Sequence, residues 1–269
     1  MCNSIRLPDP PRSDQVDDTC VLRNLQTLVQ VVNFRWTEEA CKRIPNIKKL
    51  RVVFDDVLTD YEDCLCLHYL HNLCTLQKLE SLKMRFPFCI SRYPVDLLSK
   101  RLAFPTRLNK LCLRNCSLTR EDLATIGSLQ HLQVLELIHS SFLGGEWSTF
   151  NGEFPCLKFL RIDSCDVVCW ASDTSAFRVL EKLVARDLWQ LQEIPSEMGE
   201  ISTLKLIHLH HCSESAAISA LEIKKESFGN DSLKIVVDIS WYCCSDSFWV
   251  RVKVDSFRPF GISKYIWEL

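Results

Sequence analysis

A short pattern of leucines recurs along most of this 269-residue chain. Its fullest copy runs from Leu108 to Leu118, with Leu111, Leu113 and Cys116 between them. Two apolar residues that alternate with other residues predict a short strand, because successive side chains of a strand point to opposite faces. The residue at the position of Cys116 can bond to backbone groups that the following turn leaves open. Each copy therefore predicts one strand followed by a return segment.

The copies are spaced regularly enough to give their register almost throughout. Their first apolar residues are Leu25, Ile47, Leu79, Leu108, Leu132, Leu157, Leu180 and Leu204. Most of the intervals fall within the roughly 20–29 residues of one strand plus one return segment, and the interval after Ile47 carries an insertion. The sequence therefore predicts an α/β fold, a leucine-rich-repeat solenoid with a curved parallel sheet on its concave face and helices and turns on its convex face.

The return segments are expected to be mostly helical. Thr37, Thr119 and Ser213 each stand where a hydroxyl can cap a helix whose first turn is acidic. The segment around Pro195 is expected to form a looser turn, because proline interrupts a helix.

The ends of the chain depart from the repeat pattern. We expect residues 1–20 to form a linker or a partial repeat and residues 21–239 to form the leucine-rich-repeat domain. Residues 240–269 are expected to form a non-repeat C-terminal cap or extension, in which the alternation from Phe248 to Val254 would suit an added strand.

Composition and motifs exclude several classes of function. The chain has no P-loop, no dinucleotide-binding glycine motif and only 7 glycines, so we expect neither an enzyme nor a cofactor. The net charge of −2 argues against nucleic acid as a partner, and no apolar run reaches the roughly 18 residues of a membrane span. The chain has 15 cysteines, which is an odd number, and several of them lie at the repeat position of Cys116. Both features favour reduced thiols and a cytoplasmic location.

The strongest candidate for metal binding is the segment from His208 to Cys212. His208 and His210 alternate on one face of a predicted strand, within reach of a shared ion, while Cys212 is expected to face inward. Two ligands make a weak site, so we interpret these histidines as surface residues and expect no metal site.

Charge on the predicted concave face is more informative. The outward strand positions are rich in basic residues, with Glu136 and Asp163 as the opposing charges. The residues that we expect to line a protein-binding surface are Arg51, Lys83, Arg85, Lys110, Arg114, Arg161, Arg186, His208 and His210. Such charges can serve solubility alone. They can also dock an acidic surface, with on-rate and specificity set by charge complementarity.

Several segments carry a family resemblance. The segments 22–28, 41–50, 154–160 and 180–183 resemble the C-terminal leucine-rich repeats of plant intracellular immune receptors. Among these nucleotide-binding leucine-rich-repeat (NLR) proteins, the chain is most similar to the coiled-coil class related to late-blight resistance proteins. The resemblance covers about residues 8–238 and is specific for this receptor class.

The resemblance implies a role in plant defence. In such receptors the repeats help to hold an adjoining ATPase module inactive and take part in recognising pathogen effectors. The expected partner is thus a protein, either an effector or the nucleotide-binding module of such a receptor. No such module precedes the repeats in this sequence, so a fragment or a truncated homologue is expected. The alternative is the substrate-recognition repeat domain of an F-box-type ubiquitin ligase, for which residues 1–20 are too short and proline-rich.

Overall fold

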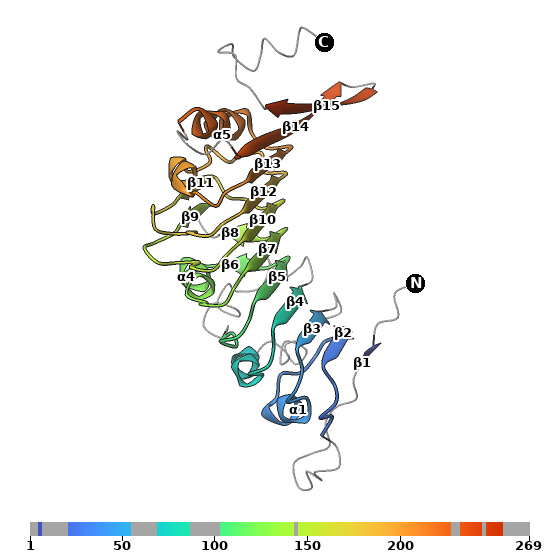
Figure 1. The fold of residues 1–269 in the computed structure, drawn as a ribbon. Coiled ribbons are helices and arrows are strands. Elements are labelled where there is room, and N and C mark those ends of the chain that lie inside the picture. Colours follow the sequence, from blue (N-terminus) through green and yellow to red (C-terminus); the bar gives the residue numbers. More distant parts are fainter. Residues whose placement is uncertain are drawn as a thin grey trace.

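A computed structural model describes residues 5–6, 21–54, 69–86, 103–142, 145–226, 232–243 and 246–254. Its main element is one sheet in the order β1-β2-β3-β4-β5-β7-β10-β12-β13-β14-β15, parallel except for the last pair. Its strands are β1 (Ile5–Arg6), β2 (Thr27–Val32), β3 (Lys49–Val53), β4 (Ser81–Arg85), β5 (Lys110–Arg114), β7 (Val134–Ile138), β10 (Phe159–Asp163), β12 (Lys182–Arg186), β13 (Leu206–His210), β14 (Lys234–Cys243) and β15 (Asp246–Val254). The strands line the inner side of a curved stack, which confirms the predicted solenoid (Figure 1).

The core lies between the sheet and the return segments. Leu111 and Leu113 are at most 1% exposed, and the repeat starts from Ile47 to Leu204 are fully buried. Leu111 pairs in register with Leu82 on one side and with Leu135 on the other, so equivalent leucines stack from repeat to repeat. This continuous apolar seam joins units that could not bury their apolar face alone.

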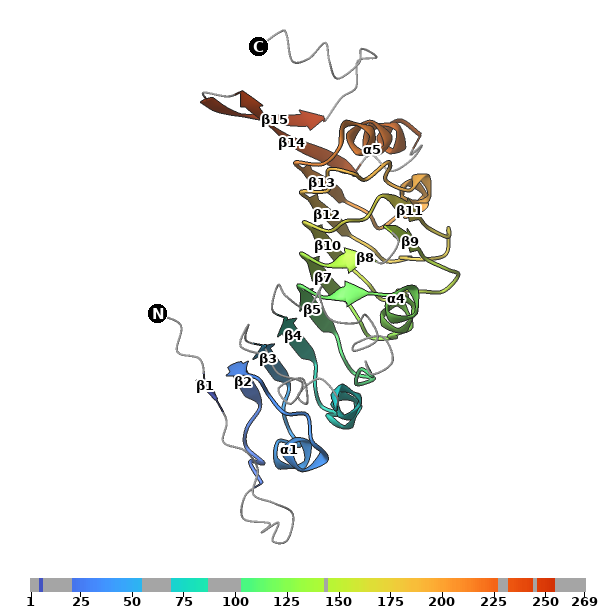
Figure 2. The same ribbon diagram turned by 180° about the vertical axis from the view of Figure 1, so that it is seen from behind.

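Helices lie along the outer side of the stack (Figure 2). They are α1 (Glu38–Arg43), the 3₁₀ helix η2 (Leu70–Thr75), α4 (Arg120–Gly127), the 3₁₀ helix η4 (Ser196–Glu200) and α5 (Glu214–Glu226). The predicted caps are confirmed, since the hydroxyls of Thr37, Thr119 and Ser213 accept backbone N–H groups three residues on, at 3.2, 3.1 and 3.1 Å. Pro195 precedes η4, and a 3₁₀ turn replaces an α-helix there, as expected.

Most of the described return segments contain a helix, as expected, and the exceptions are the described residues of the returns after β7 and β10. These two returns contain the short strands β8 (Ser141–Phe142), β9 (Glu146–Ser148) and β11 (Cys169–Ala171), and a further short strand, β6 (Ser117–Leu118), precedes α4. Parallel pairing joins β6 to β8 and β9 to β11. Trp147 of β9 stacks on Trp170 of β11 with ring centroids 4.9 Å apart. Flat aromatic rings repeated at one position favour extended backbone, because each ring then packs on the ring of the next repeat.

The cysteines at the ninth repeat position close the turns after the strands. The buried thiol of Cys165 donates to the carbonyls of Asp163 and Leu137 at 3.4 and 3.6 Å. Cys212 donates to the Ala185 carbonyl of the preceding strand at 3.5 Å. Cys116 meets the Ser140 hydroxyl at 3.3 Å. Cys165 and Cys212 therefore bond to backbone carbonyls, which needs the protonated form of the thiol, whereas Cys116 contacts a side-chain hydroxyl.

We expect these core thiols to resist alkylation. Burial raises the pKa of both Cys116 and Cys165 to about 12, so the reactive thiolate is scarce at neutral pH. In the native protein, iodoacetamide should modify the exposed Cys156 and Cys169 before these two. Peptide mass spectrometry over a time course measures the order, and denaturant should abolish it. Equal native rates at all four cysteines would contradict the packing.

The C-terminal end of the described chain continues the sheet. β14 runs past residue 239, where we expected the repeats to end, and pairs in parallel with β13. The alternating segment after Phe248 lies in β15, which is the added strand that its pattern suggested. None of the helices in the described part of the chain has the length and apolar character needed to cross a bilayer.

Candidate protein-binding site on the concave face

All nine residues predicted for the binding surface lie on the strands of the sheet. Register pairing places them in two rows across neighbouring strands. The third strand position carries Arg51, Lys83, Arg161 and His208, and the fifth carries Arg85, Arg114, Arg186 and His210. Lys110 occupies the first position of β5. Apolar residues fill the second and fourth positions and point into the core, so the basic residues face the open side.

The positive charge is concentrated in the first half of this face. We call Lys49, Arg51, Lys83, Arg85 and Arg114 the basic cluster, which spans β3 to β5. Among the residues that the structure describes, no member of the basic cluster forms an ion pair. Arg51 lies opposite Lys83, and Arg85 lies opposite Arg114. Strands are about 4.8 Å apart, so these like charges repel each other across the sheet.

Opposite charges compensate two of the basic residues outside the basic cluster. Lys110 Nζ lies 2.9 Å from Glu136 Oε1, and Arg161 forms an ion pair with Asp163. These contacts agree with the opposing charges expected from the sequence. They also divide the predicted protein-binding surface, because Lys110 and Arg161 already have ion-pair partners within the chain.

A third acidic residue on this face was missed in the sequence. This residue is Asp238 of β14, whose Oδ2 lies 2.7 Å from Nε2 of His208. The signal was available, because Asp238 follows the apolar run of the last repeat at the fifth strand position, where β13 carries His210.

The face also carries apolar residues and a covered thiol. Val134, Phe159 and Val184 occupy outward positions, and Lys182 Nζ lies 5.7 Å from the centroid of the Phe159 ring. Cys112 is fully buried although it occupies an outward position. Burial raises the pKa of its thiol, and the neighbouring Lys83 opposes this shift. The basic cluster thus borders a less charged central surface.

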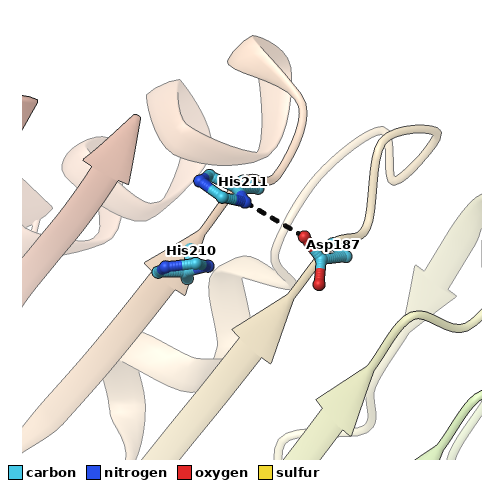
Figure 3. Close-up of side chains that lie close together, drawn as sticks. All are labelled: Asp187, His210 and His211. Carbon is cyan, nitrogen blue, oxygen red and sulfur yellow. Dashed lines mark hydrogen bonds and ion pairs between the residues drawn. The ribbon is translucent and has the colours of Figure 1, made fainter. Parts of the chain in front are cut away.

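The histidines are arranged differently from the predicted pair. His208 is held by Asp238, and its ring centroid is 6.5 Å from that of His210. His210 instead lies beside His211, with ring centroids 4.0 Å apart, and His211 Nδ1 lies 3.1 Å from Asp187 Oδ1 (Figure 3). Burial lowers the pKa of His210, as do the neighbouring His211 and Arg186.

A curved stack of strand-and-return units around a leucine seam defines a leucine-rich-repeat protein. No family model matches the chain. It is 34% identical over 239 residues to late blight resistance protein R1-A of Solanum demissum, a match that covers 82% of this chain and 17% of that protein. The late blight resistance protein homologue R1B-23 of the same plant is 30% identical over 250 residues, covering 86% of this chain and 18% of that protein. The chain is therefore homologous to the late blight resistance proteins, which confirms the resemblance seen in its sequence.

The chain spans less than a fifth of the length of these relatives. Among solved structures, the leucine-rich repeat domain of the type III effector XopL matches with a TM-score of 0.44 and 15% identity, over 69% of this chain and 68% of that one.

Proposed function

We propose that this chain is a protein-binding leucine-rich-repeat domain of a plant disease resistance protein, acting in the cytoplasm in effector recognition and autoinhibition. Its basic cluster docks on an acidic protein surface, which is either a pathogen effector or the nucleotide-binding module of such a receptor. Homology to late blight resistance proteins supports the role in defence. The predicted residues His208, His210 and Arg186 lie farther along the same face and extend the contact.

The observation that carries the proposal is the register of the basic cluster. Two pairs of like charges, Arg51 with Lys83 and Arg85 with Arg114, stand directly opposite each other on neighbouring strands. Like charges in this position destabilise a sheet. An acidic partner relieves the repulsion and gains several charge-assisted contacts at once. A surface that served solubility alone would gain nothing from placing these charges side by side.

The double variant Arg51→Glu/Arg85→Glu tests this surface. Each new glutamate faces a basic residue, Lys83 or Arg114, so the fold should keep or slightly gain stability, by about 0.2–1 kcal/mol for each pair. Binding should nevertheless weaken, by about tenfold or more, because the variant repels an acidic partner. The bait is R1-A from which the segment matching this chain has been deleted, co-expressed in leaf tissue and measured by co-immunoprecipitation.

The matched control is Arg107→Glu/Arg178→Glu, which changes the charge equally. Both residues are exposed and lie in turns outside the strands of the face. This control should bind like the wild type. Higher salt should weaken the binding of both proteins, because it screens their charges. Failure of the wild type to retain the bait would contradict docking on the receptor's own module. Equal retention of the Arg51→Glu/Arg85→Glu variant would contradict the basic cluster as the docking surface.

A further inference from the structure

Two neighbouring turns bring three metal-ligating side chains together at the end of the concave face. Asp187 follows β12, and His211 follows β13 one repeat later. Both residues have left-handed backbones, with φ of 49° and 52°. The N–H of Asp187 donates to the His210 carbonyl at 2.8 Å, which locks the two turns side by side. Backbone bonds therefore hold Asp187 and His211 on the same side, next to His210.

The three side chains are close enough to share one ion. One ligand atom from each of Asp187, His210 and His211 lies within 4.8 Å of the other two. His211 Nδ1 and Asp187 Oδ1 are 3.1 Å apart, and the two imidazole rings are adjacent (Figure 3). Two ligands of one tetrahedral zinc ion, each about 2.0–2.2 Å from the metal, are roughly 3.4 Å apart. The Asp187–His211 pair, at 3.1 Å, is close to this spacing, and the ligand atom of His210 lies within 4.8 Å of both.

The geometry points to a binding site for a divalent transition-metal ion, zinc above all, formed by Asp187, His210 and His211. Imidazole nitrogens select zinc, copper or nickel over magnesium and calcium, which prefer oxygen ligands. Three protein ligands leave a coordination position for water or for a side chain of a bound partner.

The surroundings of the three ligands suit a bound cation. All three are partly buried, and the exposed Trp189 stacks on His211 with ring centroids 5.8 Å apart, which shields one side from water. Arg186, in register with His210 on β12, is a positive neighbour of the site. Asp238 is in register with His210 on β14 and, with Asp187, offsets this charge. The site joins the last two repeats before β14, far along the sheet from the basic cluster.

The experiment is a titration of the full 269-residue chain with zinc under reducing conditions, in which calorimetry measures the binding. His211→Asn and Asp187→Asn are the test variants, because asparagine tolerates the left-handed backbone and preserves the turns. Each should weaken zinc binding by about tenfold or more, the loss expected when a metal site is disturbed. The exposed His131, in a turn outside the sheet, gives the matched control, and His131→Ala should bind zinc like the wild type.

His208→Ala separates this site from the other possible histidine pair on the face. Asp238 holds His208, so its loss should leave zinc affinity within about twofold of the wild type. A loss as large as that of His211→Asn would overturn the proposed ligand set, and so would unchanged binding in both asparagine variants.

Cobalt(II) gives a second readout, because the chain also contains cysteines. Nitrogen and oxygen ligands give visible bands without the near-ultraviolet charge-transfer band of thiolate ligands. Bound cobalt should also quench Trp189, so Trp189→Phe should remove most of the quenching at unchanged cobalt affinity. A thiolate band, or quenching that persists in Trp189→Phe, would place the ion elsewhere.

Discussion

Replacing Trp147 with alanine should lower the free energy of unfolding by about 3–5 kcal/mol. Trp147 is 1% exposed. Its ring stacks on Trp170 at 4.9 Å and 7°, and it meets Phe154 and Phe177 edge-on at 6.1 Å each. Alanine removes this packing and leaves a cavity among four remaining rings, which also include that of Phe142 at 5.6 Å, and none of the four belongs to a helix that could shift to fill it.

Urea unfolding followed by far-ultraviolet circular dichroism measures the loss. The matched control is Trp189→Ala, since Trp189 is 58% exposed and its removal leaves no cavity. It should change the unfolding free energy by no more than about 0.5 kcal/mol. A loss below about 1 kcal/mol for Trp147→Ala would contradict the stacked aromatic core.

The aromatic core shows what the leucine pattern alone did not predict. The strands followed from period-two alternation, which is strong because the inner positions tolerate only apolar side chains, as at Leu160 and Ile162. The middle return segments have no comparable alternation. They did carry a signal, because Trp147 and Trp170, like Phe154 and Phe177, recur one repeat apart and stack in pairs. The general expectation of helical returns depended on the capping residues Thr37, Thr119 and Ser213, which lie in other returns.

The position of each charged residue on the face was predictable, but its partner was not. Alternation determines that Arg85 and Arg161 point outward, since their neighbours in the chain must point inward. Whether an outward side chain is paired depends on its conformation and on the residue opposite it. Arg161 meets Asp163 on its own strand, whereas Arg85 meets Arg114.

The proposed metal ligands Asp187, His210 and His211 were not grouped from the sequence, because the backbone conformation after β13 was not predicted. Alternation groups His208 with His210, and continued through the next residue it would put His211 on the opposite face. The left-handed conformation of His211 breaks this alternation at the end of β13 and turns its ring beside that of His210. A residue just after a strand therefore needs a separate prediction, because the chain is already turning there.

Asn115 provides the test of these left-handed turns, and Asn115→Val is the change with the second largest expected effect. Asn115 has φ of 56° and is 7% exposed. Its backbone N–H donates to the Ile138 carbonyl at 3.0 Å, and its side-chain Nδ2 donates to the Phe86 carbonyl at 2.9 Å. Valine is strained by about 1–2 kcal/mol in this conformation. It also leaves the buried Phe86 carbonyl without its donor, so the unfolding free energy should fall by about 2–4 kcal/mol in total.

Asn115→Gly separates the two causes. Glycine adopts a positive φ without strain, so this variant loses the side-chain hydrogen bond but not the backbone conformation. It should therefore be more stable than Asn115→Val by about 1–2 kcal/mol in urea unfolding. Equal losses for the two variants would show that the chain does not turn left-handed here. The backbone N–H groups of four other left-handed residues donate to the next strand in the same way, namely those of His139, Ser164, Asp187 and His211. Equal losses would therefore count against the geometry of every such turn along this edge. These turns include the one that places Asp187 beside His211.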